Sequence, residues 1–452
     1  MCLNAQMLLQ FSVSNYRAFR DLQTLNLTAS NYDKALPENY ITPDLPGLKN
    51  RRWVKGAAIY GANASGKSTL IEALEAFVGF VRESAKTTDP LTPISQIEPF
   101  ALDPAAAEEP TAFAVTFVNE GVRYEYRVAA TTHLVWHESL RAFPLGKEQV
   151  WFVREWSEEL KDHLFSPDSP KGLPRDKGIE KRTLPNMLYL SKAIAENRKE
   201  LEPVFRWLVK QLKFLDLSTK AGLGGSFTIG ELQTADSSLR EGILRLLRHA
   251  DLGITGANVV DRPPSEAEFD RMLAGAPAEV QTKMRSSKWL RPELSHRAPG
   301  GGSLPLGWDR ESAGTHRLFA LVGPWLHILK SGLTVCVDEL ETSMHPLMVR
   351  ELLRLFFTDQ ENPNRAQIIF TTHNPLLLDS TLIRRDQVWF TDKDDEGKAH
   401  LYPLTDYEPR VGESLVRGYL AGRYGAVPFV PEGLLGTFPA VQKLPEKAEA
   451  EA

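Results

Sequence analysis

The segment Gly-Ala-Asn-Ala-Ser-Gly-Lys-Ser-Thr at residues 61–69 constrains the fold of this chain more than any other part of its sequence. It contains a complete G-x-x-x-x-G-K-[ST] pattern. A short apolar stretch at residues 54–60 precedes it, as expected for a buried strand, and residues 70–77 carry apolar side chains at helical spacing. A strand, a glycine-rich loop and a helix in this order are typical of a phosphate-binding loop. A nucleoside triphosphate is therefore the first ligand to consider.

Each position of this loop has an expected role. Gly61 and Gly66 permit backbone conformations that direct successive N–H groups toward phosphates. Lys67 is expected to reach the β- and γ-phosphates, and the Ser68 hydroxyl is expected to ligate Mg²⁺. Thr69 is a weaker candidate for contact with the α-phosphate. The remaining loop residues of the predicted nucleotide cradle are Ala62, Asn63, Ala64 and Ser65.

Composition narrows the class of protein. With 452 residues, 42% of them hydrophobic, the chain can bury a large core in one large or two domains. A net charge of −5 argues against a generally basic nucleic-acid binder, although a local basic groove stays open. Two cysteines give no disulfide framework, so a reducing cytoplasm fits best. No apolar run approaches the roughly 20 residues that span a bilayer, and the start does not resemble a signal peptide. A membrane partner is not expected.

A second motif supplies acidic residues. The stretch Leu-Thr-Val-Cys-Val-Asp-Glu at residues 333–339 has strand-forming residues that end in two acids, which is Walker B form. At the carboxyl end of a central strand, Asp338 would support Mg²⁺, directly or through water. Glu339 would act as the general base that polarises the attacking water. The alternative is an ordinary strand that enters an acidic turn.

A third stretch, residues 366–374, predicts another buried strand that ends in hydroxyls and a histidine. His373 would hydrogen-bond the γ-phosphate or the attacking water. A lone histidine is more often structural. Its place one strand after the Walker B motif favours the functional interpretation, because adjacent parallel strands end at the same edge of a sheet.

The fourth motif, Glu-Ser-Ala-Gly-Thr at residues 311–315, precedes an apparent helix. Ser312 and Gly314 at a helix N-terminus would form an anion site with no lysine of its own. Because this turn lies shortly before the Walker B strand, it is not expected to fold back onto the same P-loop phosphates. A dimer in which it covers ATP bound by the partner is the natural arrangement. Alone, such a turn is more often only a helix cap.

These four motifs, in this order, resemble those of the ABC-type ATPases, and within them the RecF/SMC/OLD-like clade. More narrowly, the chain is similar to the RloA-like AAA ATPases of bacterial defence and restriction-associated loci. Residues 11–19 resemble the opening strand of that clade, and residues 311–315 resemble its form of the ABC signature motif. Residues 338–346 resemble its extended Walker B and D-loop, and residues 418–428 resemble the tail of RloA-like proteins.

The resemblance implies an α/β fold of the ABC-type P-loop ATPase head, with a mixed sheet, flanking helices and an antiparallel β subdomain. Such a head closes on a second head around two ATP molecules. Ser312 and Gly314 would then act in trans, and Arg17 would touch nucleotide in cis. No obvious Q-loop glutamine stands out, and Gln96 is the candidate for this Mg²⁺-binding position.

The chain is divided into four parts on this basis. Residues 7–155 are expected to form the N-terminal part of the head, and residues 156–290 an inserted helical lobe. Residues 291–432 would complete the head with signature, Walker B and switch histidine, and residues 433–452 have no hydrophobic face and are expected to be disordered. Because sustained heptads are missing, the lobe is not expected to be a coiled-coil arm.

Local patterns give further expectations. Asn119-Glu120-Gly121 and Gly300-Gly301-Gly302 each separate two apolar stretches and predict hairpins. Residues 155–185 are expected to be exposed loop, and residues 257–288 a mobile loop with a helix. One predicted helix carries basic side chains that could contact nucleic acid, although a solvated face is favoured. These side chains are Arg240, Arg245, Arg248 and His249.

The leading hypothesis from sequence is a Mg²⁺-dependent ATP hydrolase that acts as a dimerising switch. It would serve as ATPase or sensor in anti-phage defence or nucleic-acid surveillance, with a separate effector such as a TOPRIM-type nuclease. One alternative is a scaffold that binds ATP with little turnover and sequesters a partner. Another is an OLD-like nuclease, for which the acidic stretch 392–396 is the only candidate carboxylate cluster outside the ATP site. Its flanking strands favour an acidic hairpin turn instead.

Overall fold

A computed structural model describes residues 6–215, 223–234, 237–250, 253–410 and 412–427. Its centre is a six-stranded sheet in the order β11-β15-β16-β5-β17-β18. The first five strands run parallel, and β18 is antiparallel to β17. The bounds are Leu212–Leu215 for β11, Thr334–Val337 for β15, Gln367–Thr371 for β16, Gly56–Gly61 for β5, Val388–Lys393 for β17 and Ala399–Pro403 for β18.

Every residue of β5, β15 and β16 is buried, which explains their continuous apolar character in the sequence. Alternate residues of β5 face opposite layers of the molecule. Ala57 and Ile59 belong to one apolar core, and Ala58 and Tyr60 belong to the other. The P-loop strand is therefore held from both sides, as the sequence predicts for a central strand.

The second sheet has seven antiparallel strands in the order β10-β9-β8-β7-β6-β1-β2. Helix α1 (Lys67–Glu83) packs on it, with the Phe77 ring 5.4 Å from that of Phe113 and 5.8 Å from that of Tyr126. The bounds are Met7–Ser14 for β1, Gln23–Asn26 for β2, Thr111–Asn119 for β6, Val122–Ala130 for β7, Val135–Phe143 for β8, Gln149–Ser157 for β9 and Asp162–Ser166 for β10.

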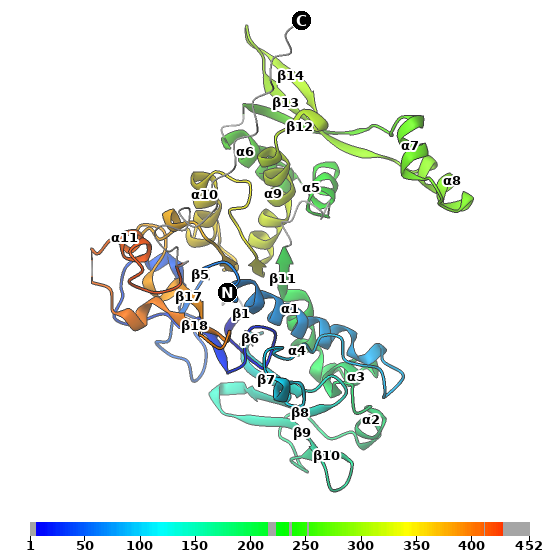
Figure 1. The fold of residues 1–452 in the computed structure, drawn as a ribbon, viewed down its shortest axis with the longest axis vertical. Helices are drawn as coiled ribbons and strands as arrows, with labels where there is room; N and C mark the ends of the chain where they lie inside the picture. Colours follow the sequence, from blue (N-terminus) through cyan, green and yellow to red (C-terminus); the bar gives the residue numbers. More distant parts are fainter. Residues whose placement is uncertain (1–5, 216–222, 235–236, 251–252, 411, 428–452) are drawn as a thin grey trace, which may run out of the picture.

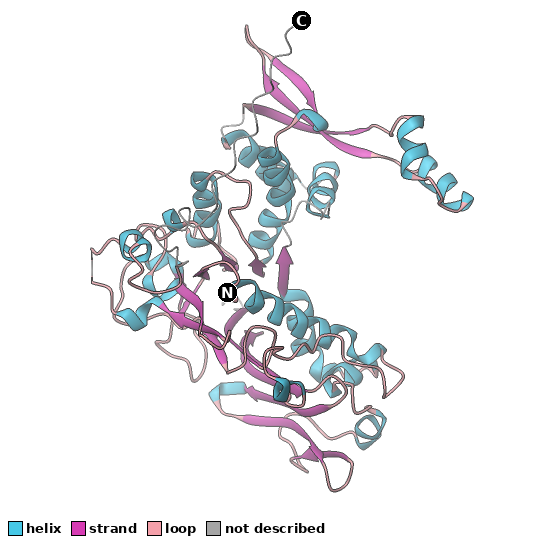
Figure 2. Ribbon diagram, in the orientation of Figure 1, coloured by secondary structure: helices cyan, strands magenta, loops and turns pink. Residues whose placement is uncertain are grey.

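Three short helices follow this antiparallel sheet, namely α2 (Lys177–Arg182), α3 (Tyr189–Ala195) and α4 (Glu202–Arg206). A fully buried ion pair joins strand β8 to strand β9, with Arg154 Nη1 3.4 Å from Glu138 Oε2. The same carboxylate accepts the backbone N–H groups of Tyr189 and Leu190, so it fixes the start of α3 on the sheet. Figure 2 shows these helices beside the sheet.

The other face of the central sheet is covered by helices whose apolar residues form the second core. Helix α9 contacts α5 and α6, and the Trp325 ring of α9 meets Phe356 of α10. The bounds are Leu223–Gln233 for α5, Ser237–His249 for α6, Ala313–Ser331 for α9 and Pro346–Phe357 for α10. The predicted architecture, a mixed sheet with flanking helices and an antiparallel β subdomain, is confirmed.

A three-stranded antiparallel sheet leaves the helical layer and carries two helices at its far end (Figure 1). Its strands are β12 (Ile254–Asp261), β13 (Leu290–Arg297) and β14 (Ser303–Gly307), and α7 (Glu266–Met272) and α8 (Ala278–Ser286) connect the first two. No residue of α8 is buried. The prediction of a loop with a helix over residues 257–288 is right about a helix, since α7 and α8 lie there, and wrong about the loop in part, because β12 extends to Asp261.

The two predicted hairpins are confirmed, since β6 pairs with β7 and β13 pairs with β14. The expected exposed loop at residues 155–185 is wrong in part, because β9 runs to Ser157 and β10 and α2 lie within it. The interval 156–290 is also not purely helical, since it contributes β10, β11 and β12. The predicted disordered tail at residues 433–452 lies outside the described residues.

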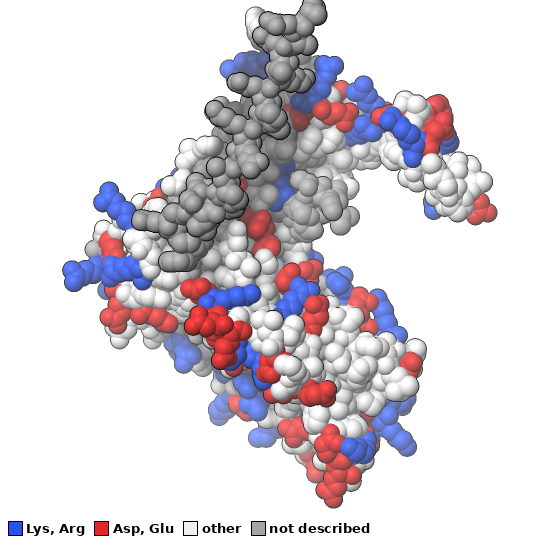
Figure 3. Space-filling view, in the orientation of Figure 1, with Lys and Arg blue, Asp and Glu red and all other residues white. Residues whose placement is uncertain are grey.

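The remaining elements are the pair β3 (Tyr40–Ile41) and β4 (Trp53–Val54), and helix α11 (Leu415–Leu420). In the described part of the chain, no helix is long and apolar enough to cross a bilayer. Basic and acidic side chains are interspersed over the visible part of the face shown in Figure 3. On α6, Arg245 lies 3.4 Å from Glu361 and Arg248 donates to the Thr255 carbonyl, so part of its positive charge is used within the molecule.

Candidate ATP site

The predicted P-loop connects β5 to α1 and has the backbone that such a loop needs. Gly66 directly precedes α1 with a φ of 105°, and Ala64 has a φ of 61°. At Gly61 a Cβ atom would lie 2.3 Å from Ser65 Oγ and 2.5 Å from Thr391 Oγ1. A side chain at position 61 therefore cannot be accommodated without displacing the loop.

The Lys67 ammonium group folds over this loop. Its Nζ donates hydrogen bonds to the carbonyl oxygens of Gly61 and Ala62, at 3.0 Å and 2.9 Å. Burial lowers the pKa of Lys67, and the negative charges of nearby acids oppose that shift. These acids are Asp338, Glu339 and Glu341. Lys67 follows β5 and the two acids follow β15, and both strands run parallel to β16 between them, so these groups lie at one edge of the sheet.

The other loop residues differ in exposure. Asn63 and Ala64 face solvent, Ser68 is half-buried and Thr69 is buried. Ser65 is buried, and its hydroxyl lies 2.7 Å from that of Thr391 on β17. The neighbouring strand therefore supports the loop through this contact.

The Walker B acids follow β15, and Thr371 at the end of the adjacent strand β16 positions them. The Thr371 hydroxyl donates to Asp338 Oδ1 at 2.5 Å and accepts the Glu339 N–H at 2.8 Å. Glu339 has a φ of 47°, in the left-handed region that non-glycine residues rarely adopt. Its carboxylate is exposed, as a base for an incoming water must be, and accepts a hydrogen bond from Thr342 at 3.3 Å.

His373 directly follows this pair of strands and lies within the same group of charges. Burial lowers its pKa, the positive charge of Lys67 lowers it further, and the acids Glu341, Glu339 and Asp338 oppose the shift. The backbone N–H of His373 donates to Glu341 Oε1 at 2.5 Å. The histidine follows β16, the strand that lies between β5 and β15.

The signature turn begins α9. Ser312 is the N-cap residue, and its side chain accepts the Thr315 N–H at 3.1 Å. A Cβ atom on Gly314 would lie 3.2 Å from the carbonyl oxygen of Ser343 in the D-loop. Among the described residues, no hydrogen bond or ion pair joins residues 311–315 to residues 61–69. The turn is exposed at Ser312 and lies beside the D-loop.

Two further predicted site residues have other contacts. Arg17 is ion-paired at 2.7 Å with Glu72 of α1 and at 2.8 Å with Glu98, which raises its pKa. Gln96 lies against Gly79, and its Cγ would be 3.7 Å from a Cβ there. Gly79 is twelve residues after Lys67 on α1, about 18 Å along the helix axis. The prediction that Gln96 ligates the metal is therefore wrong, because Gln96 lies beside the distal half of α1.

Three residues of this site had no assigned role in the sequence-based prediction. Thr371 ends β16, and Thr391 on β17 pairs with Gly61, the last residue of β5. The position of a hydroxyl at the edge of the parallel sheet is the signal that could have identified them. Glu341 was part of the D-loop resemblance only. Its contact with His373 depends on how two loops meet, which no local pattern reveals.

A family model matches residues 57–379, from the P-loop strand to beyond His373, and covers well over half of the chain. Its description reads "AAA domain, putative AbiEii toxin, Type IV TA system". The chain belongs to this AAA family. No curated protein matches the chain. The narrower RloA-like resemblance therefore remains a proposal.

Solved structures similar to this AAA protein include three SMC heads. The SMC head domain from Thermotoga maritima is 15% identical, with a TM-score of 0.37, and the match covers 88% of this chain and 98% of that one. An Smc head domain from Pyrococcus furiosus, bound to the C-terminal domain of ScpA, is 11% identical, with a TM-score of 0.40. The match covers 89% of this chain and 98% of that one. An Smc head domain with a coiled coil and joint from Pyrococcus yayanosii is 12% identical, with a TM-score of 0.36. The match covers 92% of this chain and 100% of that one.

The donor set of the AAA site fits Mg²⁺ and a triphosphate. Ser68 supplies a half-buried hydroxyl and Asp338 supplies a half-buried carboxylate, which are the hard oxygen ligands that Mg²⁺ prefers. The cradle that a Cβ on Gly61 would fill leaves the backbone open to phosphate oxygens. These residues would hold the metal and the nucleotide of a P-loop ATPase domain.

The acidic stretch of the AAA protein at residues 392–396 is the predicted hairpin turn, since β17 pairs with β18 around it. Asp394 Oδ1 accepts the N–H groups of Glu396 and Lys398, and Asp392 Oδ2 accepts the Ala426 N–H. Across the described ranges, no group of three acidic, histidine or cysteine side chains could hold a metal ion. The carboxylates of this turn hold the turn itself.

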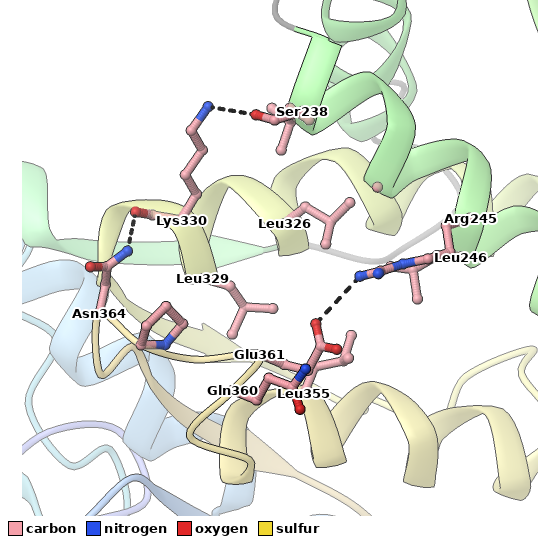
Figure 4. A pocket seen from close by; sticks show the side chains of 13 residues that line it. Ser238, Arg245, Leu246, Leu326, Leu329, Lys330, Leu355, Gln360, Glu361 and Asn364 are labelled. Carbon is pink, nitrogen blue, oxygen red and sulfur yellow. Dashed lines mark hydrogen bonds and ion pairs between the residues drawn. The ribbon is translucent and has the colours of Figure 1, made fainter.

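A pocket of about 280 Å³ lies away from the P-loop, between α6, α9 and the residues that follow α10 (Figure 4). Leu326 and Leu329 form its floor, and Lys330 donates to Ser238 across its rim. Its lining is mainly apolar and offers none of the phosphate-binding groups described above. The groups suited to bind phosphate and Mg²⁺ therefore lie at the ends of β5, β15 and β16 and not in this pocket.

Proposed function

We propose that this protein is a Mg²⁺-dependent ATP hydrolase that acts as a dimerising nucleotide switch. The observation that carries the proposal is the parallel order of β15, β16 and β5, which puts the P-loop after β5 and the acids after β15 at the same edge of the sheet. Membership of the AAA family supports nucleotide binding at these residues. A lysine that neutralises phosphate charge next to acids that hold Mg²⁺ and water is the arrangement that phosphoryl transfer to water requires.

The proposed roles follow from position. Asp338 keeps one oxygen for the metal, because the other accepts from Thr371. Glu339 is exposed at the open side of the site and would take a proton from the attacking water. His373, whose pKa is lowered by burial, would orient that water or the γ-phosphate through its ring. Bound Mg²⁺ would neutralise the charge that develops on the phosphate oxygens.

Two exposed surfaces support dimerisation as part of the switch. The P-loop is open at Asn63 and Ala64, and the signature turn is open at Ser312 beside the exposed D-loop residue Ser343. A second copy of the chain, related by two-fold symmetry, would place each signature turn over the partner's P-loop. Each nucleotide would then be bound by residues of both copies, so ATP would control assembly.

A role in bacterial anti-phage defence or nucleic-acid surveillance completes the proposal. The family description names a toxin of a type IV toxin–antitoxin system, which supports a defence context. The described residues provide an ATP site and no further metal cluster, so we propose a separate effector such as a TOPRIM-type nuclease. The cytoplasm is the proposed location, where ATP and phage nucleic acid are both present.

The Glu339→Gln variant tests the proposal. It should lower kcat by about 100-fold or more, because the base is lost while the carboxamide preserves the shape. ATP binding should persist, and light scattering with Mg·ATP should show a dimer that no longer dissociates. Glu351→Gln, at an exposed ion pair on α10, is the matched control and should behave like the wild type.

The outcomes separate the parts of the proposal. Hydrolysis at the wild-type rate by Glu339→Gln would remove the assigned base. A wild-type protein that binds ATP tightly but shows no turnover, alone or with DNA, would replace the hydrolase with an ATP-binding scaffold. A protein that stays monomeric with Mg·ATP in both forms would contradict the switch.

A further inference from the structure

The loops that follow β15 and β16 are joined by a small number of hydrogen bonds. Three of them run through Thr371, whose hydroxyl holds Asp338 and Glu339 and whose carbonyl accepts the Leu340 N–H at 3.2 Å. The fourth is the contact between the Glu341 carboxylate and the His373 N–H. This hydrogen bond holds the backbone of the switch histidine itself to the loop that follows the Walker B strand.

The second oxygen of Glu341 is buried and has no hydrogen-bond partner among the described residues. The Tyr60 hydroxyl is in the same condition. Tyr60 is the residue before Gly61, is 0% exposed, and lies close enough for the charge of Glu341 to act on it. Two buried polar atoms without partners, within electrostatic reach of each other, indicate an interaction that forms in another state of the site.

The Tyr60 ring also packs against two other aromatic side chains. Its ring meets that of Tyr419 on α11 at a centroid distance of 5.5 Å and that of Phe390 on β17 at 6.2 Å. Tyr419 stacks on Phe390 with an interplanar angle of 14°. The buried tyrosine ring is therefore packed between side chains of β17 and α11.

We propose that Glu341 is a positioning residue for ATP hydrolysis, which holds the backbone of His373 with one oxygen and would be oriented by a hydrogen bond from the Tyr60 hydroxyl to the other, which has no partner in this structure. This inference rests on the proposed ATPase function. It makes the carboxylate a link between the P-loop strand and the switch histidine, so the histidine is aligned only when the P-loop strand and the Walker B loop are both in place. Glu339 remains the proton acceptor.

The test compares Glu341→Ala with Glu341→Gln. The alanine variant leaves the His373 N–H without its acceptor and should lower kcat by about 10- to 100-fold, with the Kd for ATP within a few-fold of wild type. The glutamine variant keeps an acceptor oxygen and should recover most of that loss. Glu351→Ala, at an exposed site on the same chain segment, is the control for removing a glutamate.

A second readout concerns the charge of Glu341. Because that charge raises the pKa of His373, Glu341→Gln should move the titration of His373 seen in the pH profile of kcat to lower pH. A residue that only stabilises the fold would leave the profile in place. Circular dichroism and urea unfolding establish that each variant is folded before its kinetics are interpreted.

The orienting role of Tyr60 is tested by a double-mutant cycle. Tyr60→Phe keeps the ring contacts and removes the hydroxyl, so it should lower kcat by a few-fold in the wild type and have no further effect in Glu341→Ala. Additive losses would show that Tyr60 acts independently and would overturn that part of the proposal.

Three results would overturn the role of Glu341. Wild-type kcat in Glu341→Ala would remove it. Glu341→Gln as inactive as Glu339→Gln would make its charge, rather than its hydrogen bond, the active property. A large rise in the Kd for ATP without a fall in kcat would make it a binding residue. An inactive wild-type protein would instead refute the proposed function, so the two failures are distinguishable.

Discussion

The Thr371 hydroxyl donates a 2.5 Å hydrogen bond to Asp338 Oδ1 and accepts the Glu339 N–H at 2.8 Å. One buried side chain on the strand between β5 and β15 therefore sets both Walker B acids. The two acids have different duties in the proposed reaction, one on the metal and one on the water. Their separation depends on a residue that touches neither ligand.

Replacing Thr371 with valine should therefore impair turnover while it preserves the buried volume. The valine leaves the Glu339 N–H without an acceptor and releases one oxygen of Asp338, so kcat should fall by about 10-fold or more. Thr371→Ser keeps the hydroxyl and should stay within a few-fold of the wild type. Steady-state ATPase assays at saturating ATP measure both. Equal activity of the valine and serine variants would show that the hydroxyl does not position the acids.

The parts of this site that the sequence predicted are those encoded in contiguous residues. A P-loop and a Walker B strand each carry their function within fewer than ten residues, and parallel strands with buried faces align their ends. Lys67, Asp338 and His373 follow three neighbouring parallel strands, β5, β15 and β16, and their roles stay a prediction. Glu341 and Thr371 act through contacts between two loops, and the pattern of either loop alone does not contain them.

The errors in the middle of the chain have one physical cause. Apolar residues from Leu201 to Leu212 follow helical spacing, yet α4 ends at Arg206 and Leu212 begins β11. Strand β11 exists because Leu212 pairs with Thr334, more than a hundred residues away. Strand β12 likewise depends on β13, which lies beyond two helices. Long-range pairing overrides local propensity in such cases.

Replacement by alanine should have opposite effects on stability at two glycines, Gly61 of the P-loop and Gly79 of α1. Gly61→Ala places a Cβ 2.3 Å from Ser65 Oγ and 2.6 Å from the Thr391 carbonyl oxygen, so it should destabilise the loop and abolish measurable ATP binding. Gly79→Ala lies in the middle of α1 with its nearest neighbour at 3.7 Å, so it should stabilise the protein by about 0.5 to 1 kcal/mol. Urea unfolding and titration with a fluorescent ATP analogue measure the two effects. Wild-type ATP affinity in Gly61→Ala would contradict the proposed cradle.

Replacing only one member of the buried ion pair Glu138–Arg154 should strongly reduce the free energy of unfolding. Arg154→Met leaves a carboxylate with no exposed surface and no countercharge, which should reduce the free energy of unfolding by about 3 to 5 kcal/mol. Adding Glu138→Gln removes the unpaired charge and should restore part of that loss, because the carboxamide oxygen can still accept from α3. Denaturant unfolding of the single and double variants gives the coupling energy. Purely additive effects would show that the pair does not act as a unit.

His163 should make stability depend on pH in the acid range. Its Nε2–H donates to the Val135 carbonyl at 2.7 Å, and its Nδ1 accepts from Arg154 at 3.2 Å, so the folded protein holds the neutral ring. Burial, reinforced by the charge of Arg154, lowers its pKa to about 4. The unfolded chain has a pKa near 6.5, so between these values it binds more protons than the folded protein does.

Protonation of His163 at low pH should therefore destabilise the folded protein. The contribution of His163 is fully retained above about pH 6.5 and is lost progressively as the pH falls toward 4, with a total of about 1 to 3 kcal/mol once partial exposure is allowed for. His163→Gln cannot take up this proton, so its free energy of unfolding should fall less than that of the wild type between pH 7 and pH 4.5. Urea unfolding at several pH values measures the difference. A wild-type curve parallel to that of the variant would show that His163 is not held neutral by the fold.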